Sequence, residues 1–174
     1  MICEKTELEG IYIIKPNIFK DHRGEIVEIW NRKDYNISDI PDIEWKSDKI
    51  SISYKNTWRG LHGDNETWKL ISCLYGEIYL VVLNYNEGSK EYGKWQGFVL
   101  NDKNRLQVLV PCSYGNGHLI LSEMAIFWYK WSEYYNLDKQ FSIKWNDPRF
   151  DIKLPIKEKY MILSERDRGI EQSH

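Results

Sequence analysis

Short runs of apolar and β-branched residues recur along the chain about every ten residues, separated by glycine, asparagine or proline. Runs of this length and composition are typical of β-strands. The predicted strands cover residues 10–14, 25–30, 45–54, 70–74, 77–85, 95–100, 106–110 and 124–131. The polar segment 31–40 is the one place where a short helix is expected, and Pro41 ends it.

Alternation within two of these runs indicates faces. In 45–54, Ile50 and Ile52 share one face and Ser51 and Ser53 the other, as in a half-buried strand. In 124–131, one face carries three aromatic residues, namely Phe127, Tyr129 and Trp131.

The breaks between runs predict turns. Residues 21–24 read as a turn, Gly76 as the turn of a hairpin, and 111–117 as a break rich in small residues. About ten short strands without βαβ alternation predict an all-β fold, an antiparallel sandwich or barrel. The length of 174 residues suits one domain spanning residues 1–174.

Composition and charge narrow the class of protein. A net charge of −2 gives no general attraction to nucleic acid or to membrane surfaces, and no apolar run approaches the length of a membrane helix. Three widely spaced cysteines without a CxxC pair read as reduced thiols. With no apolar segment at the N-terminus, we expect a cytoplasmic protein.

The stretch around His62 concentrates candidate chemistry. Gly60 and Gly63 flank the histidine, and such residues often mark a bulge or a close approach of two backbones. Arg59 and His62 are three apart and would point to opposite faces of a regular strand, so a bulge at Gly60 is needed to bring them together. A neutral imidazole can act as a base near pH 7, and Arg59 and Lys69 can hold an anion.

The same residues also fit a bulged strand with solvated charges and a hydrogen-bonded histidine. Further candidates are His118, Tyr129, Asp167 and, as a second anion-binding residue, Arg23. Taken singly, Tyr129 fits a core aromatic position and Asp167 fits a charged, exposed tail.

Several short motifs follow one another along nearly the whole chain: Phe19-x-Asp21-x-Arg23-Gly24-x-x-x-Glu28, Arg59-Gly60-Leu61-His62, Lys69-Leu70, Gly76-Glu77, Pro111, Asn146-Asp147 and Leu163-Ser164-x-x-Asp167. In combination they resemble the dTDP-4-dehydrorhamnose 3,5-epimerase family. The resemblance implies a cupin-type jelly roll that needs no metal or other cofactor. It also implies a homodimer with an N-terminal strand exchanged between subunits, and nucleotide-diphospho-4-keto-6-deoxy sugars as substrates.

The resemblance assigns roles by position. It makes His62 the general base, Asp167 the carboxylate that orients it, and Tyr129 the acid on the opposite face of the sugar. Its cationic residues correspond to Arg59 and Lys69 near the reacting sugar and Arg23 near the diphosphate. Glu28, from the same motif as Arg23, is expected to bind substrate.

Departures from the family pattern point to a particular substrate. Asn116-Gly117 stands where a His-Gly pair is usual, with His118 displaced by two, and Gly63-Asp64 replaces an aromatic-Gln pair. Lys49 ends a Ser-Asp-Lys run in place of Gln-x-Asn. This combination resembles members that act on GDP-linked 4-keto-6-deoxy-heptoses in bacterial capsule synthesis. Lys49, Asp64, Asn116 and His118 are therefore expected to bind substrate, with inversion at C3 alone or at both C3 and C5.

Three other interpretations remain open. A cupin metal site would draw on His62, His118 and either Asp64 or Glu66, but it lacks the usual pair of histidines spaced by one residue. A sugar-nucleotide 3,4-ketoisomerase would use a similar fold and a histidine-tyrosine pair. A non-catalytic carbohydrate-binding sandwich would use some of the eight tryptophans to stack on sugar rings.

Overall fold

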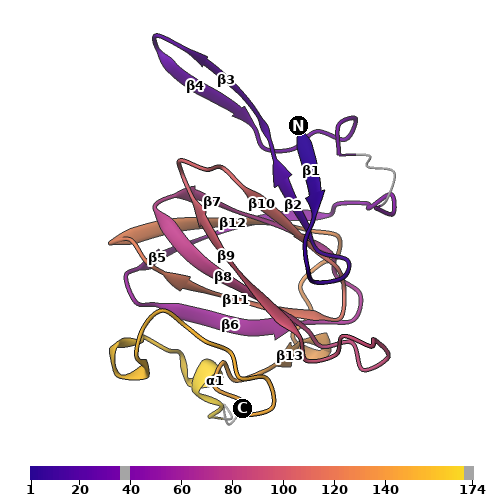
Figure 1. The fold of residues 1–174 in the computed structure, drawn as a ribbon, viewed down its shortest axis with the longest axis vertical. Coiled ribbons are helices and arrows are strands. Elements are labelled where there is room, and N and C mark those ends of the chain that lie inside the picture. The colour runs from indigo at the N-terminus through magenta and orange to yellow at the C-terminus, as the bar shows by residue number, and fades with distance from the viewer. Residues whose placement is uncertain (36–39, 171–174) are drawn as a thin grey trace.

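The computed structural model describes residues 1–35 and 40–170. Two antiparallel sheets face each other and form most of the molecule (Figure 1). The six-stranded sheet runs in the order β1 (Ile2–Lys5), β2 (Tyr12–Lys15), β10 (Gln107–Val110), β7 (Lys69–Tyr75), β12 (Met124–Trp131) and β5 (Ser47–Tyr54). The five-stranded sheet runs in the order β13 (Phe141–Ser142), β6 (Trp58–Gly63), β11 (Tyr114–Ile120), β8 (Glu77–Asn84) and β9 (Trp95–Asn101).

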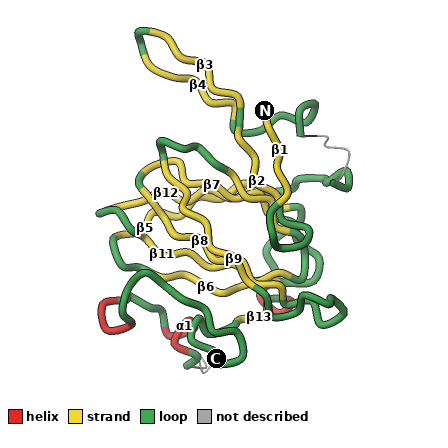
Figure 2. The backbone as a smooth tube through the Cα atoms, viewed as in Figure 1, coloured by secondary structure: helices red, strands yellow, loops and turns green. Residues whose placement is uncertain are grey.

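The remaining elements are few. β3 (Asn17–Asp21) and β4 (Gly24–Glu28) form a hairpin arm that projects from the sandwich (Figure 2). The helical elements among the described residues are two 3₁₀ turns, η1 (Leu137–Lys139) and η2 (Glu158–Tyr160), and the one-turn helix α1 (Glu165–Arg168). None of these helices is long and apolar enough to cross a membrane. Two packed antiparallel sheets with so little helix confirm the predicted all-β, jelly-roll class.

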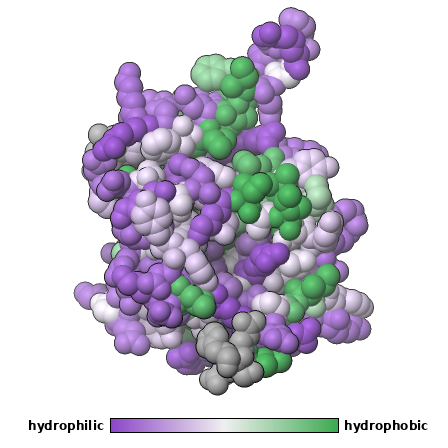
Figure 3. Space-filling model, turned by 180° about the vertical axis from the view of Figure 1, so that it is seen from behind, coloured by the Kyte–Doolittle hydropathy of each residue, from purple (hydrophilic) through white to green (hydrophobic). Residues whose placement is uncertain are grey.

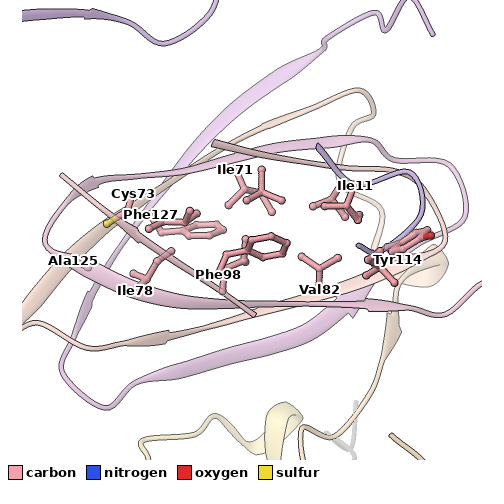
Figure 4. Close-up of a cluster of buried hydrophobic side chains, with 14 of the residues drawn as sticks. Ile11, Ile71, Cys73, Ile78, Val82, Phe98, Tyr114, Ala125 and Phe127 are labelled. Atoms are coloured by element: carbon pink, nitrogen blue, oxygen red, sulfur yellow. The ribbon is translucent and has the colours of Figure 1, made fainter. Parts of the chain in front are cut away.

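Side chains from both sheets interdigitate in an inner core, as alternation along the strands requires (Figure 4). Ile71 and Phe127 enter it from the six-stranded sheet, and Ile78 and Val82 from the five-stranded sheet. Transfer free energies put full burial of such side chains at about 1.5–3 kcal/mol each. This core supports one end of the space between the sheets.

Both outer faces are also partly covered. The C-terminal segment lays Ile143, Phe150, Ile152 and Met161 against the five-stranded sheet, around Val81 and Leu83. Part of the six-stranded sheet around Trp128 and Leu70 is covered by Ile29, Trp30, Tyr35, Ile40, Ile43 and Trp45. Strands such as β8 are thus buried on both faces, which is why they read as continuous apolar runs.

The predicted alternation of β5 is present, and its solvent face is the isoleucine face. Ile50 and Ile52 are 58% and 54% exposed, whereas Ser53 is buried. The serines face the inside of the sandwich because β5 borders a polar cavity there.

The structure differs from the predictions at one hairpin, at one break between strands and in the helical segment. β7 and β8 belong to different sheets, so the hairpin predicted at Gly76 is wrong, and that turn carries the chain across the sandwich. The predicted break at 111–117 is largely the strand β11. Residues 31–35 form turns instead of a helix, and 36–39, the rest of the predicted helix apart from Ile40, lie outside the described residues.

Candidate active site

A cavity of about 350 Å³ opens between the sheets, bounded by β5, β12 and β7 on one side and by β6 and β11 on the other. Seven of the residues selected from the sequence line it: Arg59, His62, Lys69, Asn116, His118, Tyr129 and Asp167. Residues far apart in the chain therefore meet at one place.

The bulge predicted at Gly60 is present. Arg59 pairs with His118 and His62 with Asn116, so three steps along β6 match two steps along β11. The extra residue turns Arg59 and His62 toward the same cavity. Gly60 has a φ of 126°, and a Cβ there would lie 2.4 Å from Gly117 Cα, so both its conformation and the close approach require glycine.

The imidazole of His62 meets a buried carboxylate. His62 Nε2 lies 2.8 Å from Asp167 Oδ1, and the Asp167 side chain is 4% exposed. The distance is that of a hydrogen bond, although the N–H is not aligned with the oxygen in this conformation. α1 presents Asp167, and its first turn is capped by Ser164 Oγ, which accepts from Asp167 N–H at 3.2 Å. The expected exposed tail is therefore buried at Asp167.

Lys69 reaches the cavity from the six-stranded sheet. Its Nζ donates to His62 O at 3.2 Å and to Asn116 Oδ1 at 2.8 Å. Burial lowers the pKa of Lys69 to about 8. An ammonium held by two neutral acceptors can stabilise a negative charge that develops beside it.

Tyr129 enters from β12, on the sheet opposite His62. Its ring lies between Phe127 and Trp131 in a row of tilted aromatic contacts, with centroids 5.0 and 5.6 Å away. Burial raises the pKa of Tyr129, so its hydroxyl keeps its proton at neutral pH. A protonated hydroxyl on the sheet facing a base can supply a proton from the other side of a substrate.

His118 is buried beside Phe127, whose ring it stacks on at 3.9 Å between centroids with 5° between the planes. Burial lowers its pKa to about 3, and the nearby charge of Arg59 acts in the same direction. The imidazole is therefore neutral at physiological pH. Its Nε2 has no hydrogen-bond partner among the described residues.

Arg59 and Lys49 border the same cavity. Arg59 Nε donates to Ser53 Oγ at 2.9 Å. Lys49 Nζ lies 4.0 Å from the centre of the Trp131 ring and 4.9 Å from that of Tyr135, and both rings line the cavity. These cations give the cavity an affinity for anions.

The structure places three predicted binding residues elsewhere. Asp64 does not line the cavity, because its carboxylate accepts hydrogen bonds from Thr67 in its own loop and from Gln140, just before β13. Arg23 pairs with Asp21 at the tip of the arm, and Glu28 accepts from Asn31 at its base. The arm projects away from the two sheets (Figure 1), and none of its residues lines the cavity.

Sequence reasoning also missed residues that line the cavity: Ser51, Phe127, Trp131, Tyr135, Gln140, Ser164 and Arg166. Alternation along β12 already placed Phe127 and Trp131 on the face of Tyr129, so a signal existed for those two. Gln140 follows the 3₁₀ turn η1 and Arg166 lies in the one-turn helix α1, and both elements are too short to show a periodicity. Arg166 Nε is held by Ser142 Oγ at 2.8 Å.

The metal interpretation draws no geometric support from the described part of the chain. No group of three or more histidine, cysteine, aspartate or glutamate side chains there is arranged to hold a metal ion. Of the proposed ligands, His62 and His118 line the cavity, whereas Asp64 and Glu66 do not.

Comparison with known proteins gives a consistent result. The family model described as dTDP-4-dehydrorhamnose 3,5-epimerase matches residues 5–173. The chain is 35% identical over 170 residues to the dTDP-4-dehydrorhamnose 3,5-epimerase of Escherichia coli K12, covering 95% of this chain and 91% of that protein. An archaeal enzyme of the same name, from Methanothermobacter thermautotrophicus, is 34% identical over 168 residues, or 95% of this chain and 90% of its own.

Solved structures agree in fold. The dTDP-4-dehydrorhamnose 3,5-epimerase of Elizabethkingia anophelis superposes with a TM-score of 0.90 at 37% identity, covering 97% of this chain and 94% of its own. The RmlC epimerase of Legionella pneumophila, solved with dTDP-4-keto-L-rhamnose, gives a TM-score of 0.91 at 33% identity over 97% and 90% of the two chains. Sequence, fold and cavity together show that this chain is an isomerase of the dTDP-4-dehydrorhamnose 3,5-epimerase family.

Proposed function

We propose that residues 1–174 form one epimerase domain that inverts carbon centres next to the C4 ketone of a nucleotide-diphospho-4-keto-6-deoxy sugar, without metal or cofactor. The observation that carries the proposal is the His62–Asp167 contact at 2.8 Å on one side of the cavity, with Tyr129 on the opposite sheet. Base and acid thus stand on two sides of the same space.

The proposed chemistry has no net oxidation or reduction. His62 removes the proton from C3 or C5, and the electron pair of that C–H bond forms an enolate with the C4 carbonyl. Lys69 stabilises the enolate oxygen, and Asp167 holds the imidazole and stabilises its charged form. Tyr129 returns a proton to the carbon from the other face, which inverts the centre, and solvent restores both groups.

A carbohydrate-binding sandwich would not need this arrangement. Burying a carboxylate is costly, and a module that only binds sugar gains nothing from placing it 2.8 Å from a histidine. A 3,4-ketoisomerase would use similar groups, and NMR of the product separates it from an epimerase by the position of the ketone.

We further propose that the substrate is a GDP-linked 4-keto-6-deoxy-heptose used in capsule or surface polysaccharide synthesis in the cytoplasm. Support comes from the residues in which the chain departs from the family pattern. Asn116 and His118 line the cavity and Lys49 borders it, so these departures would contact substrate directly. Relatives named for dTDP sugars make dTDP-linked hexoses the alternative to test.

Deuterium exchange tests the assignment. The protein is incubated in deuterated water with GDP- and dTDP-linked 4-keto-6-deoxy sugars, and deuterium gain is followed by mass spectrometry and NMR. His62→Asn should abolish uptake at every position. Tyr129→Phe should still exchange deuterium at C3 with retained configuration, while inverted product falls by about 100- to 10,000-fold.

Two results would contradict the roles. Exchange at the wild-type rate in His62→Asn would show that another base acts. Unchanged inversion in Tyr129→Phe would show that another group protonates the far face. A matched control is Tyr160→Phe, since Tyr160 is exposed on η2 and does not line the cavity.

We also propose that the chain acts as a homodimer in which the arm of one subunit reaches the cavity of the other. Phe19 and Ile26 lie opposite each other in the arm and are 63% and 71% exposed. Arg23, at the arm's tip, would then meet the diphosphate of a substrate bound by the partner subunit.

A further inference from the structure

Two polar atoms beside Phe127 are buried without a hydrogen-bond partner among the described residues: His118 Nε2 and Ser51 Oγ. Both residues line the cavity. His118 stacks on the Phe127 ring, and Ser51 is the register partner of Phe127 across β5 and β12. Leaving a buried donor or acceptor unpaired is costly, so a bound molecule that pairs with these atoms would recover that cost.

The chemistry of the two groups selects an uncharged partner. The buried imidazole of His118 is neutral because its pKa is lowered to about 3. A neutral imidazole has one donor and one acceptor nitrogen, and a serine hydroxyl can donate and accept. A sugar hydroxyl matches such groups, whereas a phosphate calls for cations or several N–H donors.

The position of His118 indicates which hydroxyl. Asn116 and His118 lie two residues apart on one face of β11, about 6–7 Å along the strand. Asn116 contacts Lys69 Nζ at 2.8 Å. A sugar whose C4 ketone faces Lys69 therefore turns the other side of its ring toward His118. That side of the ring contains the ring oxygen, C1, which carries the diphosphate, and C2. Its free hydroxyl is therefore the one on C2.

We propose that His118, together with Ser51, is a specificity-determining residue that hydrogen-bonds the C2 hydroxyl of the sugar. The inference rests on the proposed function, because the orientation is taken from the ketone at Lys69. It adds a requirement on the substrate: the hydroxyl next to the anomeric carbon must be present and uncharged.

A cycle of enzyme and substrate changes tests this. Wild type and His118→Phe are each assayed by deuterium exchange with a nucleotide 4-keto-6-deoxy sugar and with its 2-deoxy counterpart. Phenylalanine keeps the ring that stacks on Phe127 and loses both nitrogens. Wild type should lose about 10- to 100-fold in kcat/KM on the 2-deoxy sugar. His118→Phe should lose a similar factor on the full substrate and little more on the 2-deoxy sugar.

Tyr129→Phe serves as the comparison variant, because it should lose inversion yet keep the wild-type preference for the C2 hydroxyl in exchange. Ser51→Ala repeats the cycle independently if His118→Phe does not fold, and it should also reduce that preference. A full wild-type preference in folded His118→Phe overturns the inference and leaves the proposed function standing.

Absence of exchange with wild type on every sugar would instead overturn the proposed function. In that case, calorimetric titration with the same sugar nucleotides measures the preference for the C2 hydroxyl as a difference in affinity. Equal loss of affinity for the 2-deoxy sugar in wild type and in His118→Phe would overturn the role of His118.

Discussion

At the scale of single residues, Lys69 shows how position sets chemistry. The strand β7 carries its ammonium into the space between the sheets, where a main-chain carbonyl and an amide oxygen hold it. Neither acceptor carries a full charge, so the ammonium keeps its capacity to attract a developing oxyanion. The same burial lowers its pKa to about 8.

Lys69 should therefore set the alkaline limit of activity. Only the ammonium stabilises an enolate, so we expect kcat for deuterium exchange to fall as pH rises through about 8. Lys69→Met should lower kcat by about 100-fold or more and remove this limb of the pH profile. Lys94→Met, at an exposed position on the surface, is the control. An unchanged limb in Lys69→Met would assign it to another group.

The same residue should cost stability. The folded-state pKa of about 8 lies below the ordinary lysine pKa of 10.5, so between these pH values the unfolded chain binds more protons. Stability then rises with pH across that window, and the penalty is fully present below it. Lys69→Met should raise the free energy of unfolding at pH 7, by on the order of 3 kcal/mol at most. Urea denaturation at pH 7 and pH 10 measures this, and a less stable variant at pH 7 would contradict it.

At the scale of elements, the site depends on the close approach of β6 and β11. Gly60 faces Gly117, and a Cβ on Gly117 would lie 2.6 Å from Trp58 Cζ2. The glycines therefore let the bulge of β6 settle against β11, which turns Arg59 and His62 into the cavity.

A substitution at Gly60 should separate this packing from simple backbone strain. Gly60→Ala adds a Cβ 2.4 Å from Gly117 Cα at a φ of 126°, so we expect a loss of about 2–4 kcal/mol and a displaced His62. Gly24→Ala imposes similar strain, with a φ of 136°, but meets nothing within 4 Å. It should cost about 1–3 kcal/mol, less than Gly60→Ala. Thermal unfolding of both variants gives the comparison, and equal losses would refute the role of close packing.

The strands show what sequence can and cannot give. Alternation predicted β5 and β12 and the shared face of Phe127, Tyr129 and Trp131, because a side-chain period of two survives in any strand with one polar face. β11 was missed because its glycines read locally as a break, and the close packing of Trp58 against Gly117 is apparent only in the folded structure. The hairpin at Gly76 was wrong because a turn signal does not say whether the next strand stays in the same sheet.

The site residues likewise fall into those that the local sequence reveals and those that it does not. His62, Arg59 and Lys69 stood out because charge and glycine gather in one short stretch. Asp167 could be selected only through the family resemblance, since nothing in a charged tail predicts that it buries against His62. Asp64 looked like a ligand but stabilises its own loop, a local hydrogen-bonding role that aspartate often takes in turns.

At the scale of the whole molecule, apolar surface remains exposed outside the cavity. Ile50, Ile52 and Tyr54 lie on the outer face of the edge strand β5, and each is more than half exposed. Figure 3 shows apolar patches on the body of the molecule as well as near the arm. Exposed apolar surface of this kind marks an interaction site, and the proposed dimer would cover this strand face.

A charge on this face of β5 should prevent the proposed dimer from forming. Ile52→Glu introduces a carboxylate that cannot be buried without cost, so we expect sedimentation to show monomer at concentrations where wild type is dimeric. Val99→Glu is the matched control, since Val99 is 46% exposed on β9, in the other sheet, and should leave the assembly unchanged. Because Arg23 would reach only a partner's cavity, the Ile52→Glu monomer should also show a higher KM for the sugar nucleotide. Mixing it with Arg23→Ala protein should not restore binding, because the Ile52→Glu chain cannot pair with a second subunit. A monomeric wild type, or an Ile52→Glu protein that stays dimeric, would remove this face from the proposed interface.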